Sequence, residues 1–174
     1  MALEEVEPGA IQHVVVHLGT NDAMQNKEDT DNVKLNMAEC LSKVEDTFPE
    51  AIVTVASIPP RKGKSPAIQK YNEQVASINT YLAKLAERSL DIDFLDNTHV
   101  YMNRNNNINK RHYSDSDTSG VHLSADGQRA LTGSFLQHLR GTKPGGREGR
   151  KRGRSDGSNT PNSAEKLPKQ QHKN

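Results

Sequence analysis

The chain has 174 residues, with 23 Lys or Arg, 22 Asp or Glu, a formal net charge of +1, and 32% hydrophobic residues without any Trp. This size provides for one modest domain and leaves little for a second. Because no run approaches the roughly 18 apolar residues of a membrane span and no N-terminal secretory signal is present, we expect an intracellular protein, cytoplasmic or nuclear, without membrane association. The only cysteine is Cys40, which excludes an intramolecular disulfide and a zinc site with several thiolate ligands.

Three apolar runs are predicted to be strands. Residues 14–18 (VVVHL) are continuously apolar apart from His17, which suits a parallel strand covered on both faces and makes His17 a core imidazole with satisfied hydrogen bonds. Residues 51–58 form the second run, which Pro59 and Pro60 end because proline lacks a backbone donor. Residues 92–95 form a short third run.

Three stretches with helical spacing alternate with these runs. Apolar residues recur every three or four positions in 33–48, 68–85 and 131–139, and the last helix is expected to begin near Ser124 and to end at Gly141. The polar segment 97–119 has little periodicity. Strands alternating with helices predict an α/β domain with a parallel sheet, in which ligands bind at the carboxyl ends of the strands.

The net charge of +1 is the balance of two unlike parts. Residues 1–142 contain 14 basic and 19 acidic side chains, a net charge of −5, whereas residues 143–174 contain 9 basic and 3 acidic side chains, a net charge of +6. Apolar residues almost vanish from the second part, which cannot bury enough surface to offset its ordering entropy. We therefore expect one folded domain over 1–142 and a disordered basic tail over 143–174.

Two motifs fall where the predicted sheet would bind a ligand. HVVVHLGTNDA (13–23) contains Gly-x-Asn-Asp directly after the first strand, and SGVHLSADGQRAL (119–131) contains a His just before the last helix. Together they resemble the SGNH, or GDSL-type, hydrolase family over about 12–139. The sequences of both motifs, together with SIPPR (57–61) and FLDN (94–97), are also similar to the esterase-like domains of retroelement-encoded proteins.

This resemblance implies a flavodoxin-like, three-layer fold and the hydrolysis of carboxylic or acetyl esters without a metal or cofactor. By the same resemblance, Asn21 is an oxyanion-hole donor, since a side-chain amide can stabilise developing negative charge without losing a proton. His122 corresponds to the general base. Gly19, Asp22 and Asp117 are the supporting residues that the resemblance suggests.

The sequence also departs from the family pattern. The family's nucleophile lies in a Gly-Asp-Ser motif on a strand well upstream of Gly-x-Asn-Asp, and only about a dozen residues precede Val14. We expect an N-terminally truncated domain that lacks its first strands, its nucleophile and the oxyanion-hole Gly of the family's second segment, and that has lost catalysis. The family's orienting Asp lies three residues before the His, where this chain has Ser119, so the five-residue spacing of Asp117 predicts weaker control of the imidazole tautomer.

A missing first strand would leave residues 14–16 on an open sheet edge with unpaired backbone groups, which invites pairing with a partner chain.

Plainer interpretations of the same residues stay open. Asn21 and Asp22 are also typical of a turn followed by a helix cap, and His122 of a polar helix start. A metal site from His112, Asp115, Asp117 and His122 is disfavoured because an acidic, serine-rich loop is usually just solvated. Ser155 satisfies the Gly-x-Ser-x-Gly pattern within the tail, without the strand and helix that a nucleophile elbow requires.

The tail suggests a second class of function. Five cations lie within eight residues, namely Arg147, Arg150, Lys151, Arg152 and Arg154. They favour non-specific binding of RNA or DNA through phosphates, and the same run is typical of a weak nuclear-localisation signal. No aromatic residues are interleaved to stack bases. A merely solubilising tail fits the composition equally well.

Overall fold

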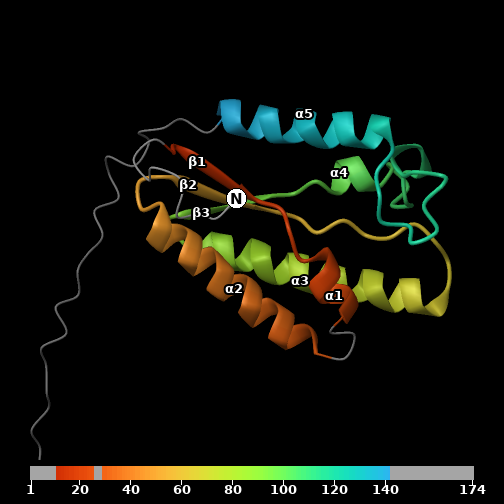
Figure 1. Cartoon of the computed structure of the whole chain (residues 1–174), viewed down its shortest axis with the longest axis horizontal. Coiled ribbons are helices and arrows are strands. Elements are labelled where there is room, and N and C mark those ends of the chain that lie inside the picture. The colour runs from red at the N-terminus through yellow and green to blue at the C-terminus, as the bar shows by residue number, and fades with distance from the viewer. Residues whose placement is uncertain (1–10, 26–28, 142–174) are drawn as a thin grey trace, which may run out of the picture.

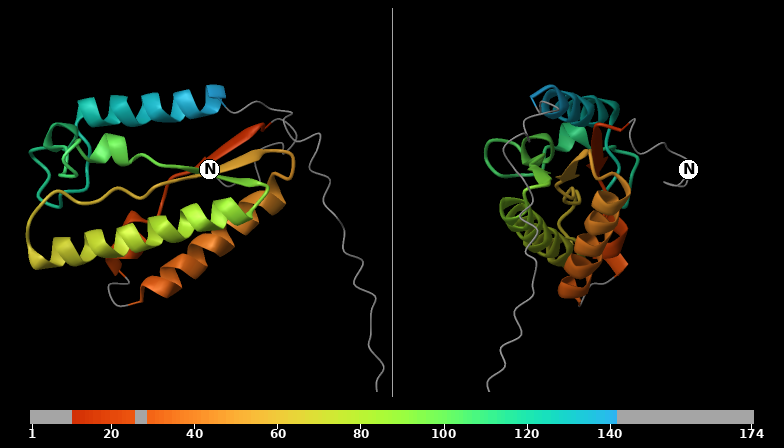
Figure 2. Two further views of the ribbon diagram at one scale, coloured as in Figure 1. Left: turned by 180° about the vertical axis from the view of Figure 1, so that it is seen from behind. Right: turned by 90° about the vertical axis from the view of Figure 1, so that its left-hand side faces the viewer.

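The computed structural model describes residues 11–25 and 29–141, which form three layers: a parallel sheet with helices on each face. The strands are β1 (His13–Val16), β2 (Ile52–Ala56) and β3 (Ile92–Leu95), in the spatial order β1-β2-β3. Helices α2 (Thr30–Thr47) and α3 (Pro66–Arg88) lie on one face, and α5 (Ala125–Gly141) with the short α4 (Thr98–Tyr101) lies on the other (Figure 1). The views in Figure 2 agree on this arrangement. The predicted α/β class with a parallel sheet is confirmed.

The strand register brings the carboxyl ends of all three strands to one end of the sheet. Val16 pairs with Val55, and Ala56 pairs with Leu95. β2 is the central strand and all five of its residues are buried, whereas β1 is mostly half-buried. Within residues 11–25 and 29–141, β1 pairs with β2 alone, so it is an edge strand of the described sheet.

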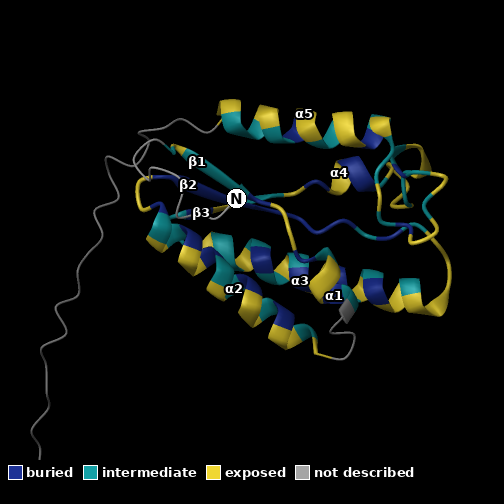
Figure 3. Ribbon diagram, viewed as in Figure 1, coloured by how far each residue is buried: buried dark blue, intermediate teal, exposed yellow. Residues whose placement is uncertain are grey.

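Local signals explain the ends of α2 and α3. The Asp29 carboxylate accepts the Asn32 N–H at 2.8 Å, which caps the start of α2. Ser65 caps α3, and Pro66 follows at a position where a missing N–H costs nothing. The predicted apolar stripes are the buried faces of both helices (Figure 3): Val33, Met37, Leu41 and Val44 in α2, and Tyr71, Val75, Ile78 and Leu82 in α3.

The segment 97–119, for which the sequence predicted little structure, forms a second small core. It contains α4, a 3-10 turn at Lys110–His112, and the buried residues Val100, Tyr101 and Tyr113. The Tyr113 hydroxyl donates to Pro60 O at 2.7 Å, which fixes this core to the segment after β2. Because these three buried residues are not periodically spaced, the sequence shows neither a helical nor a strand pattern in this segment.

Some expectations concern residues that the structure does not describe. The tail, its five clustered cations and Ser155 lie outside the described residues. Among the described helices, none is both long and apolar enough to cross a membrane.

Candidate active site

The Gly-x-Asn-Asp motif forms the transition from β1 into a short helix. Gly19 has φ +102, and a Cβ there would lie 2.7 Å from Ile58 Cδ1, so the position requires glycine. The Gly19 carbonyl accepts the Ala23 N–H at 2.9 Å and begins α1 (Thr20–Gln25). Asn21 and Asp22 lie in the first turn of α1 and are exposed. Asn21 is therefore displayed at the carboxyl end of β1, where the predicted oxyanion donor belongs.

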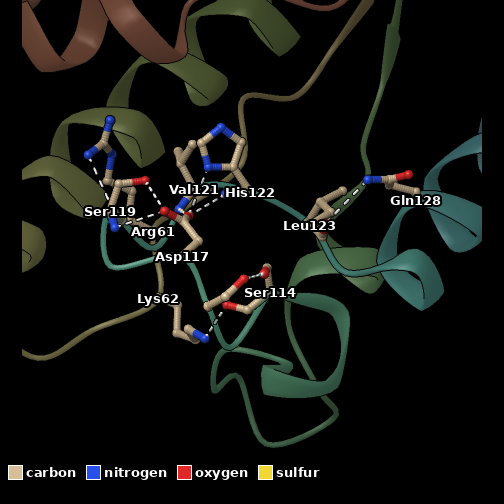
Figure 4. A network of polar contacts seen from close by, with 10 residues as sticks. Arg61, Lys62, Ser114, Asp117, Ser119, Val121, His122, Leu123 and Gln128 are labelled. Carbon is tan, nitrogen blue, oxygen red and sulfur yellow. Dashed lines mark hydrogen bonds and ion pairs between the residues drawn. The ribbon is translucent and has the colours of Figure 1, made fainter.

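Asp117 organises the turn that carries His122. Its carboxylate accepts the backbone N–H of Ser119, Val121 and His122 at 2.8–2.9 Å and the Ser119 hydroxyl at 2.7 Å (Figure 4). The His122 N–H and the Ser119 hydroxyl hold the pKa of Asp117 well below its usual range. Asp117 is therefore a carboxylate at neutral pH.

The same turn brings Asp117 to the imidazole. Oδ2 of Asp117 lies 3.1 Å from Nδ1 of His122. The expectation that a five-residue spacing places the carboxylate wrongly is therefore corrected, because the chain folds back over Asp117 between the two residues. An ionised carboxylate at this distance favours the tautomer with the proton on Nδ1.

The pair is sheltered on one side and open on the other. The Asp117 side chain is 12% exposed, whereas the His122 side chain is 74% exposed. Within the described part of the chain, Nε2 of His122 has no hydrogen-bond partner. The imidazole can therefore accept a proton on Nε2 from a group that approaches from solvent.

Two residues that follow β2 hold this turn in place. The Lys62 N–H donates to Gly120 O at 2.7 Å, and Nη1 of Arg61 lies 3.5 Å from Ser119 O. Gly120 has φ +71, and a Cβ there would lie 2.1 Å from Lys62 O. The backbone at Gly120 thus packs directly on the segment after β2, with no room for a side chain.

Tyr71 of α3 connects this turn to α1. The Arg61 guanidinium lies 4.8 Å from the centre of the Tyr71 ring. Burial raises the pKa of Tyr71, and the nearby Arg61 and Thr20 side chains oppose this rise. Thr20 precedes Asn21, so contacts run from one motif to the other through Tyr71 and Arg61. Sequence reasoning missed these two residues as parts of the site. The Arg directly after Pro59-Pro60 was the available signal.

His17 is not the core residue that the sequence predicted. It lies just beyond the end of β1 and is exposed. One edge of its ring packs on Phe135 of α5, with 5.6 Å between the ring centroids, and Nε2 lies 3.3 Å from the Tyr101 hydroxyl. Although the residue keeps contact with solvent, partial burial of its ring lowers the pKa of His17. Burial raises the pKa of Tyr101, so a neutral imidazole faces a neutral phenol.

The remaining residues of the considered metal cluster have separate partners. Asp115 Oδ1 lies 3.3 Å from Lys62 Nζ, and Nδ1 of His112 donates to Val100 O at 2.6 Å. Across residues 11–25 and 29–141, no group of three His, Cys, Asp or Glu side chains is arranged to hold a metal ion.

Comparisons with known proteins agree with this fold. Residues 2–130 match the sequence model of the GDSL-like lipase/acylhydrolase family. A search of the curated proteins gives no match.

Solved structures with a similar fold share little sequence with this chain. One, from Streptococcus pneumoniae and provisionally described as a platelet activating factor, has a TM-score of 0.63 and 22% identity over 75% of this chain and 61% of that chain. A GDSL-like lipase from Bacteroides thetaiotaomicron has a TM-score of 0.54 and 22% identity over 74% of this chain and 62% of that one. A protein from Bacteroides fragilis, provisionally described as an acylhydrolase, has a TM-score of 0.59 and 21% identity over 74% and 61%. This chain thus spans 61–62% of the length of these three proteins, and the likeness concerns the fold.

Proposed function

The chain belongs to the GDSL-like lipase/acylhydrolase family, and from this premise we propose that it is an SGNH-type ester hydrolase domain that retains the general-base pair without turning over esters on its own. The observation that carries the proposal is the 3.1 Å contact between Asp117 Oδ2 and His122 Nδ1, with the imidazole otherwise 74% exposed. A carboxylate behind the imidazole and an open Nε2 in front are the two features that a general base of this kind requires.

The proposed chemistry divides among three residues. Nε2 of His122 takes the proton from an attacking hydroxyl, and Asp117 stabilises the imidazolium that forms. The Asn21 amide donates a hydrogen bond to the oxyanion, a contribution that is typically worth about 3 kcal/mol in the transition state. If another segment or chain supplies the serine, the expected reaction is the hydrolysis of small acyl or acetyl esters: the acyl group is transferred to that serine with release of the alcohol, and water then cleaves the acyl-enzyme, without a metal.

The proposed loss of turnover rests on the nucleophile. The 174 residues contain no Gly-Asp-Ser, and no serine hydroxyl in the described ranges contacts His122 Nε2. A base without its nucleophile contributes little beyond the oxyanion donors and binding. A serine supplied by another segment, or by a partner chain that pairs with the β1 edge, would complete the site. The resemblance of the two motifs to retroelement-encoded esterases supports a retroelement origin.

Hydrolysis of p-nitrophenyl acetate by the full chain tests this function. We expect no saturable turnover, and release of p-nitrophenol by His122→Ala within about twofold of the unmodified protein, because a surface imidazole alone is a weak catalyst. His99→Ala, which removes another exposed imidazole, is the matched control. Saturable turnover that is abolished by His122→Ala and retained by His99→Ala would contradict the proposal that the chain is inactive. Saturable turnover that survives His122→Ala would contradict the role of His122.

The composition of the tail favours a second function, the non-specific binding of RNA or DNA. Five of the eight residues 147–154 are cations, and contacts of this kind release counterions from the phosphate backbone. We expect the full chain to be retained on immobilised RNA at low salt and released steeply as the salt rises. A variant without residues 143–174 should lose this retention. Equal retention of both proteins would show that the tail does not bind the RNA.

A further inference from the structure

A basic cavity is lined in part by Lys62, whose N–H donates to Gly120 O in the turn that carries His122. Its volume is about 560 Å³, and the side chains that line it include those of Lys62, Lys64, Asn107, Ile108, Lys110 and Asp115. Asp117 and His122 do not line it. We propose that this cavity binds a phosphorylated small molecule, in a site separate from the proposed ester chemistry.

The charges in the cavity do not balance. Three lysines and one carboxylate line it. That carboxylate, Asp115, is already paired with Lys62 Nζ at 3.3 Å. Within the described ranges, the ammonium groups of Lys64 and Lys110 have neither an ion pair nor a hydrogen bond. Two uncompensated cations in one concave site raise the local concentration of anions.

Lys62, one of the lining residues, is held in place by its own contacts. Its side chain is 20% exposed, and its Nζ donates to Ser114 O at 2.6 Å (Figure 4). The next residue, Gly63, has φ +145, and a Cβ there would lie 2.3 Å from Ile68 Cδ1. The backbone from Lys62 to Lys64 is therefore pinned against α3, so one cation is preorganised and the wall beside it is fixed.

The opposite wall is held by its own polar contacts. The Asn103 side chain accepts the N–H of Asn105 at 2.9 Å and that of Asn107 at 3.1 Å. These bonds fix the loop that brings Asn107 and Ile108 toward Lys64. Both segments that line the cavity are therefore constrained.

The donors and the size define the class of ligand. Lysine ammonium groups are point charges that bind phosphate oxygens without requiring planar geometry. A volume of about 560 Å³ exceeds one inorganic phosphate and lies in the usual range of small-molecule sites. Among the described residues, no aromatic side chain lines the cavity, so stacked nucleic-acid bases are a poor fit.

Titration of the full chain with pyrophosphate, followed by calorimetry and by amide chemical shifts, tests the proposal. We expect a Lys64→Ala/Lys110→Ala double variant to weaken binding by roughly tenfold or more, because it removes two charged donors. Both lysines are exposed, so the double variant should fold. Lys84→Ala, an exposed lysine of α3, should bind as the unmodified protein does.

Chemical shifts separate this cavity from the basic tail. The largest changes are expected at the Gly63 and Ile108 amides, and glycerol phosphate should shift the same amides whereas acetate should not. Unchanged affinity in the double variant, or shifts confined to residues 143–174, would overturn the proposal. Hydrolysis of p-nitrophenyl acetate is a separate measurement, so failure of the ester function leaves this test unaffected.

Discussion

Replacing Gly120 by alanine is expected to lower the free energy of unfolding by about 3 kcal/mol, through backbone strain and a steric clash. The residue has φ +71, and the added Cβ would lie 2.1 Å from the backbone oxygen of Lys62. Because that neighbour is backbone, no side chain can move aside. The turn would have to shift and lose the bond from the Lys62 N–H to Gly120 O, which is 2.7 Å long.

Urea unfolding of Gly120→Ala and Gly133→Ala measures this effect against a matched control. Gly133 lies inside α5, and nothing lies within 4 Å of a Cβ built there. Gly133→Ala should therefore raise the free energy of unfolding by about 0.5–1 kcal/mol, the usual gain from alanine inside a helix. The two glycine substitutions are thus expected to change the free energy of unfolding in opposite directions. A Gly120→Ala protein as stable as the unmodified chain would show that the turn does not pack on Lys62.

Leu41→Ala is expected to cost about 3 kcal/mol, because it removes a large side chain from the centre of the layer beneath the sheet. Leu41 is 0% exposed and belongs to the main cluster of buried residues. Leu35 lies on the same helix, α2, and is 67% exposed. Leu35→Ala should change the free energy of unfolding by less than about 0.5 kcal/mol.

Thermal and urea denaturation of both variants give this comparison directly. The two substitutions delete the same atoms from one helix, so the difference between them reports burial rather than helix propensity. Similar losses in both variants would mean that α2 does not bury Leu41 against the sheet.

Much of the fold was predictable because it depends on local patterns. The stripe at Val33, Met37 and Leu41 predicted α2, and the run at residues 51–58 predicted the second strand, which the structure places at the centre of the sheet with all its residues buried. These patterns persist because one face of each helix and both faces of a central strand exclude water.

The parts that sequence reasoning missed depend on polar contacts or on contacts distant in the chain. Helix α1 is six residues long, TNDAMQ, and has no apolar stripe. The Asp117 turn is closed by backbone N–H groups and by a positive φ at Gly120, neither of which a spacing rule records. Tyr71 of α3 lies near Thr20 of the first motif and under Arg61, which contacts Ser119 of the second. No local pattern contains this arrangement.

The central claim is that Asp117 holds the proton of His122 on Nδ1 and leaves Nε2 free as a base. Nitrogen-15 NMR of the imidazole measures this directly in the full chain, at a pH where the ring is neutral, with the His122→Ala spectrum to assign the signals. The account predicts that the Nδ1–H tautomer predominates for His122, because a carboxylate oxygen lies 3.1 Å from Nδ1. A predominant Nε2–H tautomer would contradict it.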